Sequence, residues 1–393
     1  MESLPAKHDP LIRPVMPELD SVRGIAVAGV LLLHAFYWQY SSFHFSGLAR
    51  LCMLATQPGG LGVNLFFVLS GFLITGILLD SKEKPQYFRR FYTRRALRIL
   101  PAYYLLLILL AMLHSASAAY IGLSFAYLGN VTGLFGVPAD YGPLWSLAVE
   151  EHYYIFWPAV IYKLTRGHLT AVTVAICMLT PILRAVFFHL GYTAGLGWYT
   201  WFVADGLATG SLLGILLRTS ASRKVVAVLC GTLLLGGFTL AGVGRQFGIL
   251  TRERILGAAL QETIIGIVFA GFLLLVLLLG TSARRRYVNN SVLRFLGYIS
   301  YGLYLVHLLV FRMYDKLCRI FWPSLQPTSD HFGLIVLRFF LAGGAAIGLA
   351  YLSRKYFEER FLRLKDRFAG AKNAELLLVS RAKEEASPRE ASA

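Results

Sequence analysis

The stretch ELDSVRGIAVAGVLLLHAF, residues 18–36, decides the fold class of this chain. Every residue from Gly24 to Leu33 is small or apolar, and a helix needs about 20 apolar residues to cross a bilayer. Segments of this character recur along the whole chain. We identify them at residues 22–40, 60–79, 99–114, 118–136, 144–163, 170–190, 198–217, 225–243, 258–280, 293–312 and 333–353.

The composition agrees with a membrane protein. Hydrophobic residues make up 56% of the 393 residues and charged residues only 15%, whereas about a quarter of a soluble domain is charged. No long polar block interrupts the apolar segments, so we predict one all-α transmembrane domain over residues 18–362. We expect cytoplasmic tails at 1–17 and 363–393, the second mobile because it is polar and of mixed charge.

The net charge of +17 does not indicate a nucleic-acid partner. The basic residues cluster in short loops between apolar segments, where they set membrane topology and contact lipid headgroups. The lipid bilayer is therefore the expected partner. The four cysteines, Cys52, Cys177, Cys230 and Cys318, show neither metal-ligand spacing nor an obvious pairing, and we expect no metal site.

The loops also predict the orientation. Residues 80–98 hold seven Lys or Arg against two acids, so this loop is expected in the cytoplasm, and with two spans before it the N-terminus lies there too. Counting 118–136 as a span would place the basic loops near 163–166 and 218–224 outside. That segment is rich in glycine, and we predict a re-entrant or interfacial piece. About ten transmembrane helices remain, with both termini cytoplasmic, in the cell inner membrane; Arg245, Arg252 and Arg254 then lie outside, at some cost.

Arg23 and His34 are the first candidate site residues. They are eleven positions apart, so they share one helix face, about 16 Å apart along the axis. An ionisable residue at mid-bilayer costs roughly 2.5–3.5 kcal/mol and is a functional candidate by default. Asp20 is placed to orient Arg23, and a neutral His34 can act as a base. An interfacial anchor plus a hydrogen-bonded core histidine is an equally good account of this pair alone.

The next two motifs are weaker by themselves. GGLGVNLFFVLSGFLITG, residues 59–76, places Asn64 and Ser70 inside a span, but small residues also serve ordinary helix packing. FRRFYTRRALRILPAYY, residues 88–104, groups Arg94, Arg95 and Arg98 at the mouth of a span. Guanidinium groups bind phosphate in a bidentate manner, although spacing alone favours a topology determinant.

The fourth motif is PLWSLAVEEHYYIFWP, residues 143–158. Glu150 and Glu151 fall inside an apolar stretch bounded by Trp145 and Trp157. A buried carboxylate can orient a histidine in an acid–base pair. A structural ion pair with an arginine of another span explains the acids equally well.

The fifth motif is LGYISYGLYLVHLLVF, residues 296–311. Ser300, Tyr304 and His307 recur at i, i+4 and i+7, which draws a polar stripe along one helix face. Such a stripe either lines a cavity or holds neighbouring helices together.

The order of these motifs resembles that of the acyltransferase-3 family, integral membrane enzymes that O-acylate bacterial glycans, lipids and some small molecules. Arg-x10-His, VNLFFVLSGFLIT, RRALRILPAYY, WSLAVEEHYYIFWP and ISYGLYLVH follow one another over residues 18–360. The resemblance implies a ten-helix bundle that takes acyl-CoA, by default acetyl-CoA, from the cytoplasm. Its contacts would be Arg94, Arg95, Arg98 and Ser70.

The resemblance also implies the transfer itself. His34, assisted by Arg23 and Glu150, would serve transfer of the acyl group to a hydroxyl of a carbohydrate, glycolipid or small-molecule acceptor on the outer side. Asp20, Asn64, Trp145, Ser300, Tyr304 and His307 would line the route. Whether His34 is a general base or carries the acyl group stays open.

Three features depart from the family pattern. His152 stands where Gln often follows the paired acids, and Glu358-Glu359-Arg360 replaces a closing Glu-x-Pro. We see no fused periplasmic esterase-like domain, so either a second transfer step needs a periplasmic partner or the bundle acts alone. A proton-coupled transporter of a polar solute is the alternative function, but it predicts inverted-repeat symmetry, which we do not find.

Overall fold

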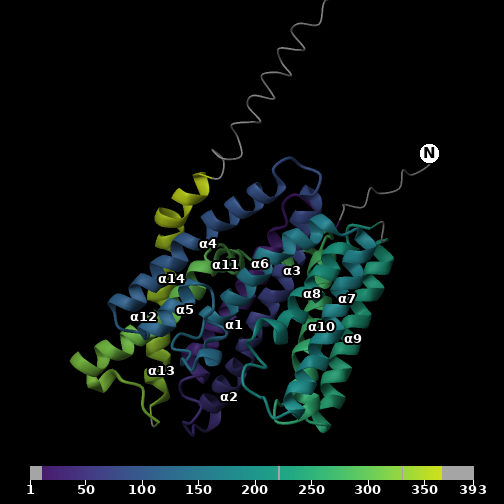
Figure 1. Ribbon diagram of the computed structural model, residues 1–393. Coiled ribbons are helices and arrows are strands. Elements are labelled where there is room, and N and C mark those ends of the chain that lie inside the picture. Colours follow the sequence, from purple (N-terminus) through teal and green to yellow (C-terminus); the bar gives the residue numbers. More distant parts are fainter. Residues whose placement is uncertain (1–10, 220–221, 330, 365–393) are drawn as a thin grey trace, which may run out of the picture.

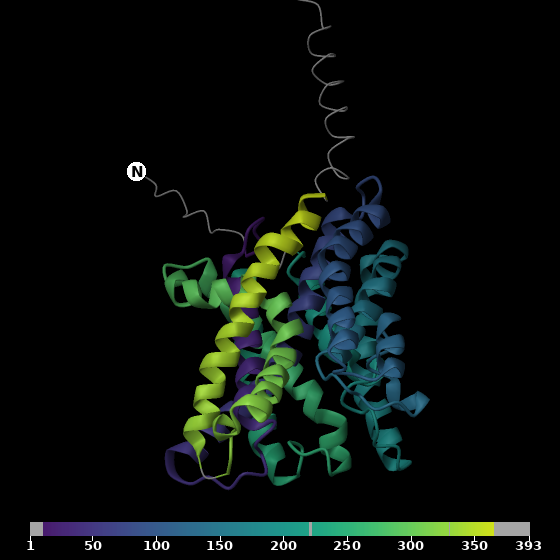
Figure 2. The same cartoon turned by 90° about the vertical axis from the view of Figure 1, so that its left-hand side faces the viewer.

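Long helices stand side by side in one bundle (Figures 1 and 2). The computed structural model describes residues 11–219, 222–329 and 331–364, and helices are the only regular elements in those ranges. The predicted tails fall mostly outside the described residues. The longer helices are α1 (Pro17–Leu32), α3 (Gly62–Ser81), α4 (Tyr87–Met112), α6 (Leu144–Lys163), α7 (Arg166–His189), α8 (Thr200–Leu216), α9 (Arg223–Gln246), α10 (Ile255–Gly280) and α12 (Ser300–Phe321). The shorter ones are α2 (Gly47–Thr56), α5 (Ala118–Phe125), α11 (Ser291–Tyr298), α13 (Phe332–Arg338) and α14 (Gly344–Leu352).

The apolar helices confirm a membrane protein. In the described ranges, seven helical stretches are long and apolar enough to cross a bilayer, or eight if a bent pair counts as one span. Two further predicted spans are helical but less suited to lipid, because α6 carries two acids and a histidine and α8 has only 17 residues. The number ten therefore stays a prediction.

The segment 118–136 holds no helix of spanning length. Helix α5 has eight residues and is followed by turns and a 3₁₀ turn at Thr132–Phe135. Buried tyrosines donate hydrogen bonds to backbone carbonyl groups in or near this segment, although other residues of the segment are exposed. Tyr103 donates to the carbonyl of Ser124 (2.7 Å), and Tyr120 donates to the carbonyl of Tyr141 (2.6 Å).

The prediction of one continuous span over 293–312 is wrong. The helix breaks at Ile299, and α11 and α12 meet at 76°. The cause is close packing of α11 on α1 through two glycines. A methyl group on Gly24 would overlap the carbonyl of Leu293, and one on Gly297 would overlap the carbonyl of Asp20. Helix α11 thus follows α1, while α12 turns into the bundle.

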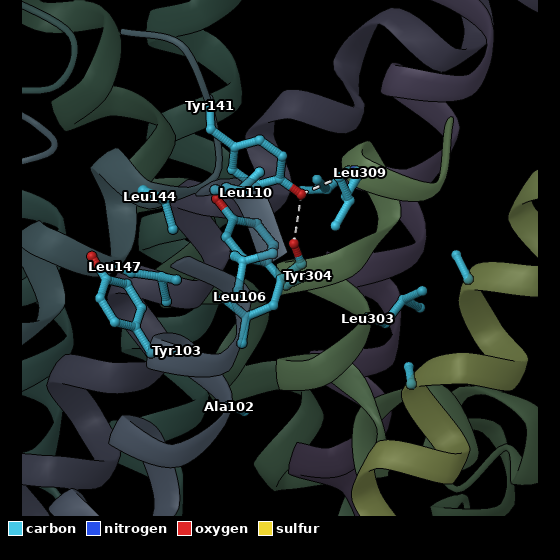
Figure 3. Packing of buried hydrophobic residues seen from close by; sticks show 14 of the residues in the cluster. Ala102, Tyr103, Leu106, Leu110, Tyr141, Leu144, Leu147, Leu303, Tyr304 and Leu309 are labelled. Carbon is cyan, nitrogen blue, oxygen red and sulfur yellow. Dashed lines mark hydrogen bonds between the residues drawn. The ribbon is translucent and has the colours of Figure 1, made fainter. Parts of the chain in front are cut away.

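The largest buried cluster joins α1, α4, α6, α12 and α14 (Figure 3). Its polar anchor is Tyr141, just before α6. The Tyr141 hydroxyl donates to the carbonyl of Leu305 (2.7 Å) and accepts from the amide of Leu309 (3.0 Å). This contact fixes the height of α12 beside α6, and α12 carries the fifth sequence motif.

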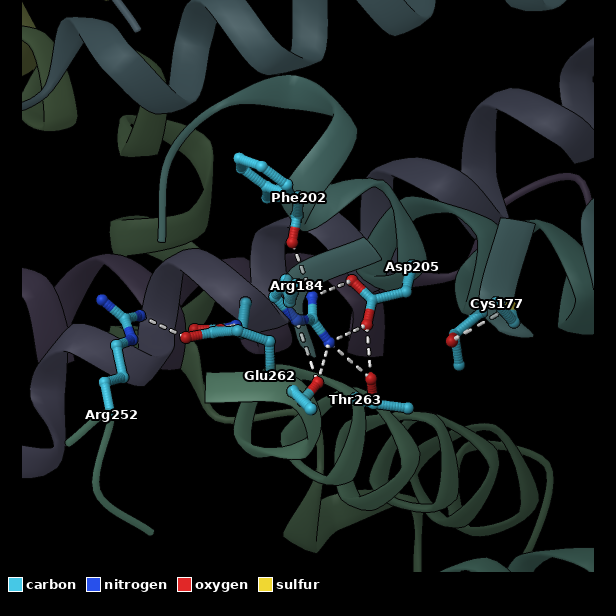
Figure 4. A network of polar contacts seen from close by, with 10 residues as sticks. Cys177, Arg184, Phe202, Asp205, Arg252, Glu262 and Thr263 are labelled. Atoms are coloured by element: carbon cyan, nitrogen blue, oxygen red, sulfur yellow. Dashed lines mark hydrogen bonds and ion pairs between the residues drawn. The ribbon is translucent and has the colours of Figure 1, made fainter. Parts of the chain in front are cut away.

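A second cluster ties α7, α8 and α10 together (Figure 4). Arg184 is fully buried and forms a two-pronged ion pair with Asp205, with distances of 3.1 and 2.8 Å. Arg184 also donates to the carbonyls of Phe202 and Ala259 and to the hydroxyl of Thr263. Every nitrogen of this guanidinium is bonded, so the cluster is a structural cross-link.

Candidate active site

A cavity of about 100 Å³ lies among α1, α3, α4, α6 and α12. Each of the five sequence motifs contributes to it, although the motifs are far apart along the chain. Its polar lining residues are Arg23, Ser70, Arg95, Arg98, Ser146, Glu150, Glu151, Tyr154, Ser300, Tyr301 and Tyr304.

The Glu150 carboxylate is held by two hydroxyl groups. It accepts hydrogen bonds from Ser70 (2.7 Å) and from Tyr154 (3.1 Å). Ser70, predicted to bind the cofactor, therefore has a protein partner in the cavity. Among the described residues, Glu150 has no histidine partner, so the predicted carboxylate–histidine pair is not formed. Its role in catalysis stays a prediction.

The three predicted arginines separate. Arg95 and Arg98, three positions apart, share the face of α4 that lines the cavity. Arg95 lies over the ring of Tyr154, 4.8 Å from its centre. Neither arginine makes a hydrogen bond or an ion pair with any residue that the structure describes. Arg94 is exposed and is not among the lining residues.

Arg23 lies on the same cavity from α1. Its guanidinium forms an ion pair with Asp20 over 2.6 Å, as the sequence predicts. Three guanidinium groups and two carboxylates thus face one small space. Arg23 is paired with Asp20, so Arg95 and Arg98 are the lining cations without an ion pair among the described residues, and they favour an anionic ligand at the α4 side.

His34 lies outside this cavity, in the wide π turn Leu33–Tyr37 that follows α1. Its Nδ1 atom is 2.9 Å from the carbonyl oxygen of Val30 and 3.3 Å from Nε2 of His307. His307 is 1% exposed. The partner of His34 is therefore a second histidine, which the sequence analysis placed on the route without pairing it. The sequence feature that could have indicated this pair is the presence of a histidine in each of two apolar spans.

Tyr304 lies between the histidine pair and the cavity. Its hydroxyl is 2.6 Å from that of Ser146 in the cavity wall. Its ring centre is 6.0 Å from that of His307, one turn further along α12. Of the predicted stripe, Ser300 and Tyr304 line the cavity and His307 contacts His34. Tyr304 thus contacts both the cavity wall and the histidine pair.

Asn64 and Trp145 take other positions. Asn64 donates to Glu262 of α10 over 2.5 Å, and Glu262 forms an ion pair with Arg252 (Figure 4). The Trp145 ring packs against Phe67, with ring centres 5.9 Å apart, and Phe67 lines the cavity.

His152 and Glu358, two residues that depart from the family pattern, have protein partners. His152 lies 2.7 Å from the hydroxyl of Thr200, which also accepts from Asn130 of the irregular segment. Glu358 is buried against Gly302 of α12 and pairs with Arg354 at 3.4 Å.

The comparisons with known proteins cover most of the chain. A family model for an acyltransferase domain, of the acyltransferase-3 type, matches residues 16–355. The chain is 28% identical over 352 residues to the peptidoglycan O-acetyltransferase OatA of Listeria monocytogenes, covering 80% of this chain and 52% of the relative. It is 31% identical over 202 residues to the putative peptidoglycan O-acetyltransferase YrhL of Bacillus subtilis, covering 45% of this chain and 29% of the relative.

The matched part is about half of each of these relatives or less. No solved structure matches the chain. Among the described residues, no group of three or more His, Cys, Asp or Glu is arranged to hold a metal ion.

Proposed function

The chain belongs to the acyltransferase-3 family, and we propose that it moves an acyl group, by default acetyl, from cytoplasmic acyl-CoA to a hydroxyl group. The acceptor is a carbohydrate or glycolipid on the extracytoplasmic side. The observation that carries this proposal is the arginine-lined cavity next to a histidine pair. The names of the two relatives support a carbohydrate acceptor and acetyl transfer, and they do not favour the transporter alternative.

The donor enters at the α4 side. Arg95 and Arg98 have no carboxylate partner within ion-pair distance among the described residues, so their guanidinium groups are free to bind phosphate. A cavity of about 100 Å³ holds a small acyl group or several waters. The phosphates of acyl-CoA then lie at the edge of the cavity beside Arg95 and Arg98, the nucleotide lies outside against α4, and only the thioester end reaches inward.

The transfer takes place at the histidine pair. His34 either removes the proton of the acceptor hydroxyl or accepts the acyl group itself before passing it on. In both routes the oxygen–acyl bond forms, the acyl–sulfur bond breaks, and the hydroxyl proton leaves with the CoA thiol. Glu150, held by Ser70 and Tyr154, balances the charge of the arginines when the donor is absent.

Cell-envelope chemistry tests this function. We expect mass spectrometry of envelope glycans to show one acyl unit on a defined sugar in cells that express the wild-type chain. Cells with the His34→Ala variant should lack it, and cells with His44→Ala, a change at an exposed histidine nearby, should keep it. An unchanged glycan profile without the gene would argue against the proposal.

A further inference from the structure

We propose that His307 is a positioning residue that fixes the proton of neutral His34 on Nδ1 and so leaves Nε2 unprotonated and reactive. The catalytic meaning of this assignment rests on the proposed function, but the position of the proton does not. Two sets of hydrogen bonds determine the position of the proton: those of His307 with the backbone of α12, and those of His34 with His307 and Val30.

The first step fixes His307. Its Nδ1 atom is 2.9 Å from the carbonyl oxygen of Tyr304 and 3.1 Å from that of Leu303. Carbonyl oxygens only accept, so Nδ1 must carry the hydrogen. A neutral imidazole has one N–H, and Nε2 of His307 is therefore an acceptor. A flipped ring would set a carbon against both carbonyls, in a residue that is only 1% exposed.

The second step fixes His34. The Nδ1 atom of His34 faces two acceptors, Nε2 of His307 at 3.3 Å and the carbonyl of Val30 at 2.9 Å. It therefore carries the hydrogen and shares it between them. The lone pair of neutral His34 is then on Nε2. A base and an acyl carrier both need this lone pair, so the assignment holds for either route.

The contact also stabilises the charged form of His34. When Nε2 takes the hydroxyl proton, Nδ1–H keeps both acceptors, and a hydrogen bond from a charged donor is about twice as strong as a neutral one. A carboxylate does this in hydrolase triads. A neutral histidine does it here without burying a second charge in the membrane.

The backbone at His34 is adapted to this contact. The π turn Leu33–Tyr37 closes with a bond from the amide of Trp38 to the carbonyl of Leu33 (2.8 Å). Such a turn inserts one residue into a helix and occurs often at functional sites.

The test compares His307→Gln with His307→Met. Gln keeps a donor for the α12 carbonyls and an acceptor for His34 on one terminal amide, whereas Met keeps neither at similar volume. We expect Met to lower kcat about 100-fold with KM for acyl-CoA unchanged within about twofold, and Gln to keep kcat within about tenfold of wild type. Equal loss in both variants, or none in Met, would overturn the proposal.

Nitrogen NMR of the ¹⁵N-histidine-labelled protein gives a readout independent of activity. The His34 signals, identified by their loss in His34→Gln, should show the Nδ1–H tautomer in the wild-type protein and a mixture in His307→Met. The Nε2–H tautomer in the wild type would refute the assignment even if no variant folds. The Nδ1–H tautomer in a protein without acyl transfer would support the assignment and contradict the proposed function.

Discussion

At the scale of single residues, Arg98 and Arg94 allow two roles of the basic motif on α4 to be tested: binding of acyl-CoA and setting of membrane topology. Both arginines are exposed, but Arg98 lines the cavity and has no acidic partner among the described residues, whereas Arg94 is not among the lining residues. We expect Arg98→Ala to raise KM for acyl-CoA about tenfold or more, because a bond to a charged group contributes about 1.5–3 kcal/mol. Arg94→Ala should change KM less than about threefold. Steady-state kinetics with both variants measures this, and equal effects would mean that the motif acts only as a topology determinant.

The sequence was most informative about residues that share a helix. Spacing along α12 placed Ser300 and Tyr304 on one helix face, because helix periodicity fixes which side chains share a face, and both line the cavity. Spacing along α4 grouped Arg94 with Arg95 and Arg98 and did not show that Arg94 lies off the cavity. The bond from Ser70 to Glu150 and the contact between the histidines join residues far apart in the chain. Helix periodicity says nothing about such contacts, which depend on how the helices pack.

At the scale of elements, α11 packs on α1 directly before the start of α12, whose first residue, Ser300, lines the cavity. The backbone of α11 meets Gly24 directly, whereas Gly122 of α5 has open space around it. We expect Gly24→Ala to push α11 away and to lower both the melting temperature and the activity. Gly122→Ala should leave both nearly unchanged. Thermal unfolding in detergent and acyl-transfer assays measure these two effects. A stable, active Gly24→Ala protein would show that the close contact between Gly24 and the backbone of α11 is not required.

The Arg184–Asp205 pair gives a second test at this scale. Removing Asp205 leaves a fully buried guanidinium without its counter-charge, which costs about 3–5 kcal/mol. Asp205→Ala should therefore lower the melting temperature strongly. Asp80→Ala, which breaks the more exposed pair with Arg218, should cost less than about 1 kcal/mol. Similar melting curves for the two variants would show that the buried pair is not a structural cross-link.

The break at Ile299 could not be predicted from the sequence. Residues 293–312 read as one apolar run, and hydropathy does not register a bend when both halves stay apolar. The signals were Gly24 and Gly297, which permit two backbones to touch. They identify a close contact only when the partner helix is known. The weakness of 118–136 as a span was predictable, because glycines interrupt it.

At the scale of the whole molecule, residues near 11 and near 364 lie at the same end of the bundle, and the connection from α9 to α10 lies at the other (Figure 1). An even number of membrane crossings requires the two ends of the described chain to lie on the same side. We expect reporter fusions after Ser282 to lie in the cytoplasm and fusions after Thr251 to lie outside. Both reporters on one side of the membrane would contradict the predicted topology.

The central claim is that this bundle transfers an acyl group by means of His34. The most direct measurement supplies radiolabelled acetyl-CoA and a peptidoglycan fragment to the purified chain in lipid nanodiscs. The label should move to the fragment, and His34→Ala should lower the rate at least 100-fold, in the range of general acid–base catalysis, while His44→Ala keeps it. Transfer by His34→Ala at the wild-type rate would contradict the account.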